Sequence, residues 1–310
     1  MDASSTKKHT IAVIVPTLNA GDCWTAWLAA FASQSCSADH VLIVDSSSND
    51  QTAVLAEQSG YDVLTIQRQE FNHGTTRQLA ADRFVSADII MYLTQDALLA
   101  DGDAICNLVA AFEDEQVGAA YGRQLPHTDA KPIGAHARLY NYPDMSAVRS
   151  SSDIARLGLK VAFLSNSFSA YRKTALMAVG GFPADNIFGE DAYVASKLIL
   201  SGWKIAYRAD AKVYHSHDYS ITQDFKRYFD IGVFHSREPW LRSSFGGAEG
   251  EGKKFVISEL KYLLTQAPWL IPSAMARTGI KYLGYRLGML EKKMPASLKY
   301  RLSMHKRFWL

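Results

Sequence analysis

The stretch that decides the fold is DIIMYLTQDA, residues 88–97. Its five consecutive apolar residues predict a buried strand, and the polar residues after them place the carboxylate of Asp96 at the end of that strand. In open α/β sheets, ligands bind beyond the carboxyl ends of the strands, so Asp96 is a candidate functional residue. The alternative is that Asp96 only caps the following turn.

Three further apolar runs precede this stretch, at residues 11–15, 41–45 and 63–66. Between the first two runs, a helical face is formed at i, i+3, i+4 and i+7 by Trp24, Trp27, Leu28 and Phe31. Asp22 and Asp50 stand where they could cap helices, and further helical patterns cover residues 75–84 and 105–112. Strands that alternate with helices are typical of βαβ units, so we predict an α/β fold with a mainly parallel sheet flanked by helices.

The composition is that of a folded protein, with 310 residues, of which 48% are hydrophobic and 21% charged. Cys23, Cys36 and Cys106 form no C-x-x-C pair, and their odd number predicts reduced thiols without a disulfide or zinc role. Residues 1–10 are polar, and the apolar run after them is too short for a signal peptide. We therefore expect a cytoplasmic protein.

Charge is distributed unevenly along the chain. Residues 253–310 hold 12 Lys+Arg and 2 Asp+Glu, a net charge of +10, which leaves −8 for residues 1–252. The longest uncharged stretch in this part, residues 262–276, is shorter than the roughly 20 residues that span a bilayer. We predict a catalytic domain over residues 1–245 and a basic amphipathic helical extension over residues 246–310.

The loops after the first two runs are more specific. They contain VPTLN at residues 15–19, which lacks the G-x-G-x-x-G of dinucleotide-binding proteins, and VDSSSNDQT at residues 44–52. Both resemble the nucleotide-binding opening of inverting family 2 glycosyltransferases with the GT-A fold, and the resemblance extends with gaps to about residue 240. It implies that a sugar nucleotide is bound by Thr17, Asn19, Asp45 and Asp50. Each of these residues could instead serve as a turn or helix cap.

A third motif, FNHGTTR at residues 71–77, is predicted to open a helix. The free amides of a helix start, that of Gly74 included, and the permanent charge of Arg77 would suit a diphosphate. The motif resembles one in bacterial rhamnosyltransferases of family 2. The resemblance implies that the donor is dTDP-L-rhamnose.

The stretch around Asp96 corresponds to the D-x-D metal motif of the wider family. The resemblance implies that Gln95 and Asp96 lie at the donor and that Asp96 binds Mg²⁺ or Mn²⁺. Further along, HSH at residues 215–217 would place two histidines on one face of a continuing strand. His215 is the expected additional metal ligand, and His217 is the alternative.

Adjacent acids open a predicted helix at Glu190 and Asp191. The resemblance implies that Glu190 contacts the acceptor and that Asp191 is the general base. The reaction needs such a base, because the acceptor hydroxyl must lose its proton as it attacks. Two acids at a helix start are also common capping and dipole partners.

Together these motifs imply an inverting glycosyltransferase that moves L-rhamnose to a glycan or lipid-linked acceptor in bacterial lipopolysaccharide biosynthesis. One alternative is a sugar-phosphate nucleotidyltransferase, although no basic glycine-rich triphosphate loop is visible near the first strand. Another is a non-catalytic glycan-binding or scaffold protein, although Asp45, Asp96 and Asp191 are all retained.

The basic extension predicts peripheral attachment to the anionic inner face of the cytoplasmic membrane. Nucleic acid is not an expected partner, because the acidic remainder of the chain would be repelled by it. The alternative is that the apolar residues of the extension pack on the catalytic domain or on a second copy, with the charges facing solvent.

Overall fold

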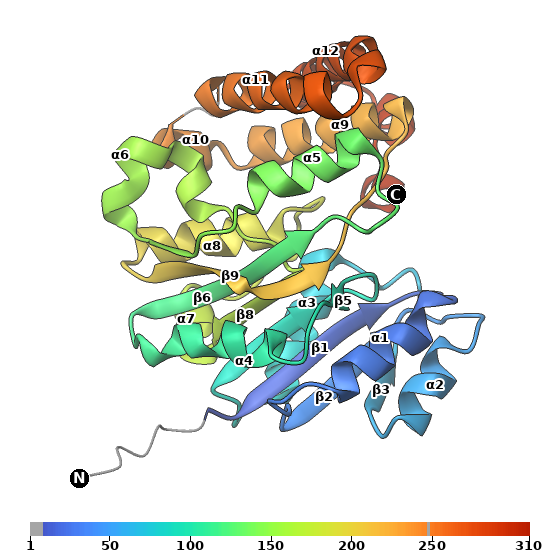
Figure 1. Ribbon diagram of the computed structural model, residues 1–310, viewed down its shortest axis with the longest axis vertical. Coiled ribbons are helices and arrows are strands. Elements are labelled where there is room, and N and C mark those ends of the chain that lie inside the picture. Colours follow the sequence, from blue (N-terminus) through green and yellow to red (C-terminus); the bar gives the residue numbers. More distant parts are fainter. Residues whose placement is uncertain (1–8, 247–248) are drawn as a thin grey trace.

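The protein folds around one mixed sheet covered by helices (Figure 1). The computed structural model describes residues 9–246 and 249–310. Most of the polar amino-terminal stretch, residues 1–8, and residues 247–248 of the predicted extension lie outside the described residues.

The strand order is β3-β2-β1-β4-β8-β6-β9-β5, and β7 pairs with β9. The strands are β1 (Ile11–Thr17), β2 (His40–Asp45), β3 (Asp62–Thr65), β4 (Ile89–Leu93), β5 (Leu98–Leu99), β6 (Val117–Leu125), β7 (Ala147–Arg149), β8 (Phe168–Arg172) and β9 (Lys204–Tyr214). Strands β1 to β4 pair in parallel, as predicted, whereas β8 runs antiparallel to both β4 and β6. Because an antiparallel neighbour needs no crossover helix, the alternation seen in the first half does not continue.

Two apolar cores lie on the two faces of the sheet. Along β1, Ile11, Val13 and Val15 pack into one core with α1, while Ala12 and Ile14 pack into the other. The helices are α1 (Cys23–Ala32), α2 (Thr52–Gln58), α3 (His73–Arg83), α4 (Ala104–Val109), α5 (Pro132–Asn141), α6 (Ile154–Leu157), α7 (Lys173–Ala178), α8 (Glu190–Leu200), α9 (Ile221–Arg237), α10 (Pro239–Phe245), α11 (Glu249–Gln266), α12 (Ile271–Gly288) and α13 (Ala296–Leu302).

Two local predictions are wrong. The side chain of Asp22 makes no capping hydrogen bond to α1. Cys36 and Cys106, expected to be reduced thiols, form a disulfide, and only Cys23 is a free cysteine among the described residues. The pairing arises because the chain after α1 meets the start of α4, which brings two cysteines 70 positions apart to a Cα distance of 5.3 Å. No local pattern indicates that contact.

The predicted extension is helical and packs on the rest of the protein. Helix α12 lies along α9, and a Cβ atom on Gly288 would collide with the backbone of Phe229. Helices α11 and α12 form one end of the molecule (Figure 1). No helix among the described residues is long and apolar enough to cross a membrane.

Candidate active site

Three parallel strands deliver predicted donor residues to one edge of the sheet. Thr17 ends β1, Asp45 ends β2, and Asp96 follows β4 by three residues. The carboxyl ends of parallel strands are the usual ligand-binding edge of such sheets. The structure therefore brings together the polar residues that follow the first, second and fourth strands.

Asp45 organises the loop that follows β2. Its side chain is buried, 2% exposed, and it accepts hydrogen bonds from Thr17 Oγ1 at 3.1 Å, from Ser48 N at 2.8 Å and from Ser48 Oγ at 2.6 Å. Asp45 thus ties the loops after β1 and β2 together.

Asn19 and Asp50 add further links between the same loops. Asn19 has a left-handed backbone (φ 48°), and its Oδ1 accepts a hydrogen bond from Asn49 N at 2.8 Å. Asp50 accepts hydrogen bonds from Gly21 N at 3.0 Å and from Thr52 N at 3.0 Å. These contacts place Asn19 and Asp50 beside Asp45 and give the site a preformed rim.

Gln95 fastens the loop after β1 to the loop after β4. Its Oε1 accepts a hydrogen bond from Leu18 N at 2.7 Å, and its Nε2 donates to Leu18 O at 3.1 Å. A carboxylate could accept the first bond but could not donate the second. The amide of Gln95, directly before Asp96, therefore fixes the loop after β1.

Asp96, His215 and His217 form what we call the Asp-His-His cluster. Asp96 Oδ2 lies 3.4 Å from His215 Nε2 and 3.7 Å from His217 Nε2, and one ligand atom from each residue lies within 4.8 Å of the others. The structure thus joins both histidines to Asp96, whereas the sequence left them as alternatives. Burial acts to raise the pKa of Asp96, but hydrogen bonding to His215 and the charge of that histidine produce a net downward shift.

Gln124 sets the orientation of the His215 ring through its contact with Nδ1. Gln124 Oε1 lies 2.9 Å from His215 Nδ1 and accepts a hydrogen bond from Arg138 Nη1 at 2.7 Å, while Gln124 Nε2 donates to Ser165 Oγ at 3.1 Å. Because this network makes Oε1 the acceptor, it assigns a hydrogen to Nδ1 in both states of the ring: a protonated ring donates from Nε2 to Asp96, and a neutral ring offers the Nε2 lone pair to a cation. Sequence patterns missed Gln124 and Arg138, since neither belongs to a recognisable motif.

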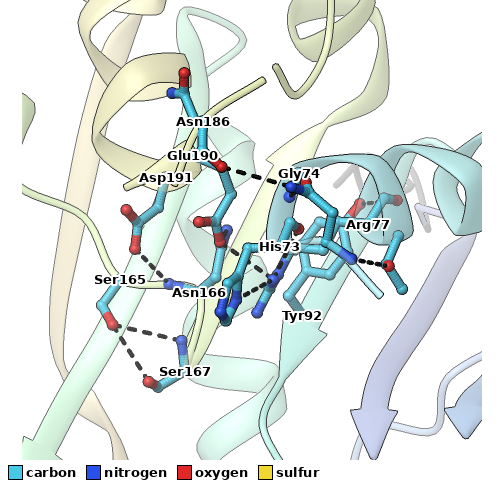
Figure 2. A network of polar contacts seen from close by, with 12 residues as sticks. His73, Gly74, Arg77, Tyr92, Ser165, Asn166, Ser167, Asn186, Glu190 and Asp191 are labelled. Atoms are coloured by element: carbon cyan, nitrogen blue, oxygen red, sulfur yellow. Dashed lines mark hydrogen bonds and ion pairs between the residues drawn. The ribbon is translucent and has the colours of Figure 1, made fainter. Parts of the chain in front are cut away.

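Glu190 and Asp191, the acid pair, open α8 and have different surroundings (Figure 2). Glu190 is 5% exposed, and its Oε1 pairs with Arg77 Nη1 at 3.2 Å and accepts from Asn166 Nδ2 at 3.0 Å. Arg77 Nη1 also donates to His73 O at 2.9 Å. In this geometry the guanidinium of Arg77 and the carboxylate of Glu190 pair with each other, and the roles expected for Arg77 at a diphosphate and for Glu190 at an acceptor stay predictions. The first turn of α3 faces the start of α8, which explains why the two charges neutralise each other.

Asp191 has no cation partner among the described residues. Its Oδ1 accepts from Ala192 N at 2.7 Å, and its Oδ2 accepts from Asn166 N at 3.3 Å. Burial raises the pKa of Asp191 to about 7, and the charge of Glu190 adds to the rise. A carboxyl group that titrates near neutrality is suited to take up and release a proton at physiological pH.

The amide of Gly74 is not free to bind a ligand, contrary to the sequence prediction. Asn72 Oδ1 caps α3 by accepting from Gly74 N at 2.9 Å and from Thr75 N at 3.1 Å. A Cβ atom on Gly74 would collide with Pro183 O, so glycine is needed for close packing. Beside this helix start, a cavity of about 330 Å³ is closed on its other side by residues 304–308.

Comparison with known proteins identifies the relatives of this chain. The model of glycosyl transferase family 2 matches residues 12–180. The O-antigen chain rhamnosyltransferase RfbN of Salmonella typhimurium is 47% identical over 300 residues, which cover 96% of each chain. WbaN of Salmonella anatum, also an O-antigen chain rhamnosyltransferase, is 45% identical and matches 96% of this chain and 95% of its own.

Solved structures share the fold at low sequence identity. The mannosyltransferase PcManGT from Pyrobaculum calidifontis, in complex with GDP-Man and Mn²⁺, has a TM-score of 0.57 and 18% identity, covering 98% of this chain and 86% of its own. TarS of S. aureus, residues 1–349 with UDP-GlcNAc, has a TM-score of 0.51 and 15% identity, covering 92% and 91%. With the predicted GT-A-type fold confirmed by these neighbours, the chain belongs to glycosyltransferase family 2.

Proposed function

We propose that this protein transfers L-rhamnose from dTDP-L-rhamnose to a hydroxyl group of a growing O-antigen glycan. The observation that carries the proposal is the near-full-length identity of 47% with an O-antigen chain rhamnosyltransferase. The arrangement of the site supports the reaction class, because a candidate metal cluster and a carboxyl group of near-neutral pKa belong to the same fold.

Asp191 is the proposed general base. Its carboxylate accepts the proton of the acceptor hydroxyl while the acceptor oxygen attacks the anomeric carbon from the side opposite the leaving diphosphate. Glu190 holds α8 against α3 through Arg77, and its charge keeps the pKa of Asp191 high. Such an in-line displacement converts the β-linked sugar of the donor into an α-L-rhamnoside.

The Asp-His-His cluster fits a divalent cation, because one carboxylate and two imidazole nitrogens converge. When bound, such an ion neutralises negative charge on the phosphoryl oxygens. Two imidazoles suit a transition-metal ion better than Mg²⁺, which prefers oxygen ligands. We therefore expect Asp96, His215 and His217 to hold Mn²⁺ in preference to Mg²⁺.

Donor turnover tests the proposed function. The purified protein would be given dTDP-L-rhamnose, UDP-glucose or GDP-mannose with lipid-linked O-antigen precursors and Mn²⁺, and glycan extension would be followed by mass spectrometry. We expect extension with dTDP-L-rhamnose only, giving an α-linkage by proton NMR. Transfer from another donor would refute the assignment of rhamnose as the transferred sugar. A β-linked product would refute the inverting mechanism.

We also propose that α11 and α12 dock on an anionic membrane, where a lipid-linked acceptor would reside. Side chains exposed on these helices and the turn between them include Leu264 (63%), Trp269 (74%) and Tyr282 (62%). They lie in the +10 part of the chain, and each basic residue near an anionic surface contributes about 1 kcal/mol.

Vesicle co-sedimentation tests this docking. The parent should bind vesicles rich in phosphatidylglycerol and not phosphatidylcholine vesicles, and binding should weaken as salt is added. A Leu264→Ser, Trp269→Ser double variant should bind less, whereas Val85→Ser, at a site 83% exposed outside these helices, should bind like the parent. Equal binding of the double variant and the parent would contradict the proposed surface.

A further inference from the structure

Arg227 lies partly buried on α9, between the Asp-His-His cluster and the acid pair. Its guanidinium carbon is 5.6 Å from the ring centre of Tyr219 and 5.9 Å from that of Phe188. The ring of Tyr219 contacts that of His217, with centres 5.3 Å apart, and Phe188 stands two residues before Glu190. Arg227 is therefore one ring away from the cluster and next to the segment that leads into the acid pair.

Arg227 has no acidic partner within ion-pair distance among residues 9–246 and 249–310, unlike three other arginines that face the interior. Arg77 pairs with Glu190, Arg237 with Glu291 and Arg277 with Asp224. For Arg227, the described part of the chain provides the two aromatic rings and neither a side-chain hydrogen bond nor an ion pair. A cation removed from water normally acquires an anion, and five guanidinium N–H groups are available to bind one.

The same wall continues from Phe188 to His305 and His73. The rings of Phe188 and His305 stack with centres 5.7 Å apart, and His305 meets His73 edge-on at 5.3 Å. Burial is the main reason that the pKa of His305 falls to about 4, and the charge of Arg227 contributes to the shift. Arg227 thus places a permanent positive charge beside the rings of Tyr219 and Phe188.

We propose that Arg227 binds the diphosphate of the donor and stabilises it as the leaving group. This inference rests on the proposed function, in which the bond from the anomeric carbon to the β-phosphate oxygen breaks and its electron pair stays on that oxygen. The acceptor oxygen forms the new bond to the anomeric carbon, and its proton passes to Asp191. A guanidinium can donate two parallel hydrogen bonds to phosphate oxygens, which is the task that the sequence assigned to Arg77.

Calorimetric binding of dTDP and of thymidine, with Mn²⁺ present, tests the proposal on the full chain. Arg227→Gln should weaken dTDP binding about 10- to 100-fold, because hydrogen bonds to charged groups are lost, and should leave thymidine binding unchanged. Arg227→Lys should show a smaller loss, since it keeps the charge without the fork. Lys226→Gln removes the same charge from the neighbouring residue of α9 and should bind dTDP like the parent.

Two results would overturn the role of Arg227: parental dTDP affinity in Arg227→Gln, or an equal loss of dTDP and thymidine binding, which indicates a packing role. The parent is first screened against dTDP, UDP, GDP and inorganic diphosphate. A parent that prefers UDP or GDP refutes the proposed donor, and the same variants compared on the preferred diphosphate still decide the role of Arg227.

Discussion

Adjacent carboxyl groups respond oppositely to burial at the start of α8. Burial acts to raise the pKa of Glu190, but the charge of Arg77 lowers it overall, whereas the pKa of Asp191 rises. In the proposed mechanism, the ion pair between Arg77 and Glu190 therefore acts on catalysis through Asp191. The negative charge of Glu190 is stabilised by Arg77, and this charge keeps the proton affinity of Asp191 high.

Glu190→Gln should shift the pH–rate profile of transfer to lower pH. The rate of the parent should rise with pH through about 7, because the ionised form of Asp191 is the proposed base. Removing the charge of Glu190 favours the ionised form of Asp191, so the transfer rate should begin to rise at a lower pH. The Gln side chain still offers an oxygen that accepts the hydrogen bond from Asn166. Steady-state rates between pH 5 and pH 9 measure the shift.

The control for this experiment is Asp191→Asn. Its transfer rate should no longer rise with pH through about 7 and should be about 10² to 10⁴ times lower than that of the parent. Far-UV circular dichroism at the assay temperature confirms that Glu190→Gln is folded despite the unpaired Arg77. If the rate of the folded variant rises at the same pH as that of the parent, Glu190 does not raise the pKa of Asp191.

Gln124→Leu should weaken Mn²⁺ binding about 10- to 100-fold, the usual effect of removing a partner behind a metal ligand. The variant leaves Nδ1 of His215 without its acceptor, so the ring loses its preferred tautomer and orientation. Gln124→Glu keeps an acceptor and should retain affinity, and Ser165→Ala removes the acceptor of Gln124 Nε2 without removing the contact between Oε1 and His215. Electron paramagnetic resonance of free Mn²⁺ gives the affinities without turnover, and parental binding by Gln124→Leu would contradict the role.

Among single residues, sequence patterns predicted those that follow strands or open helices, such as Asp45, Asp96 and Asp191. They did not predict which charges meet. Arg77 looked like a free cation at a helix start, and only the packing of α3 on α8 shows that Glu190 neutralises it. Arg227 sits within a helix and belongs to no local motif.

Helices α9 and α12 form a seam built on glycine. Gly232 of α9 and Gly284 and Gly288 of α12 let the two backbones approach closely, with carbonyl oxygens of the opposite helix where a Cβ atom would be. The amphipathic pattern predicted helices in the extension, but the glycine spacing that fixes their partner looks unremarkable in a sequence of 20 glycines.

Gly288→Ala should destabilise the protein by about 1 to 3 kcal/mol, because the added methyl group forces the seam apart. Gly279→Ala on the same helix meets nothing within 4 Å and should be neutral or stabilising by up to about 1 kcal/mol through helix propensity. Urea unfolding followed by circular dichroism measures both free energies. Equal free energies of unfolding for Gly288→Ala and Gly279→Ala would contradict the close packing of α9 on α12.

The whole molecule is held together by contacts between the predicted catalytic domain and the predicted extension. Asp224 of α9 is buried against Arg277 and Lys281 of α12. Asp230 accepts hydrogen bonds from Met304 N at 2.9 Å and His305 N at 3.1 Å. The charge asymmetry of the sequence revealed a distinct segment, but it could not show that this segment supplies counter-charges to the acidic part.

A fragment ending at residue 246 should therefore lose cooperative unfolding. Its α9 would expose the seam to water and lose the ion pairs that Asp224 makes with Arg277 and Lys281. The full chain should show one urea transition with coincident tryptophan fluorescence and circular dichroism. A fragment with a sharp transition at the midpoint of the full chain would establish residues 9–246 as an independent domain.

The cavity beside α3 is closed by segments from distant parts of the chain. Arg307 hydrogen-bonds to the carbonyl oxygen of Arg68 across 239 positions, and residues 304–308 line the cavity together with residues 71–73. During synthesis, the donor loops leave the ribosome long before their opposite wall is translated. The cavity therefore gains its second wall only after residues 304–308 have emerged, later than residues 71–73, which form the first.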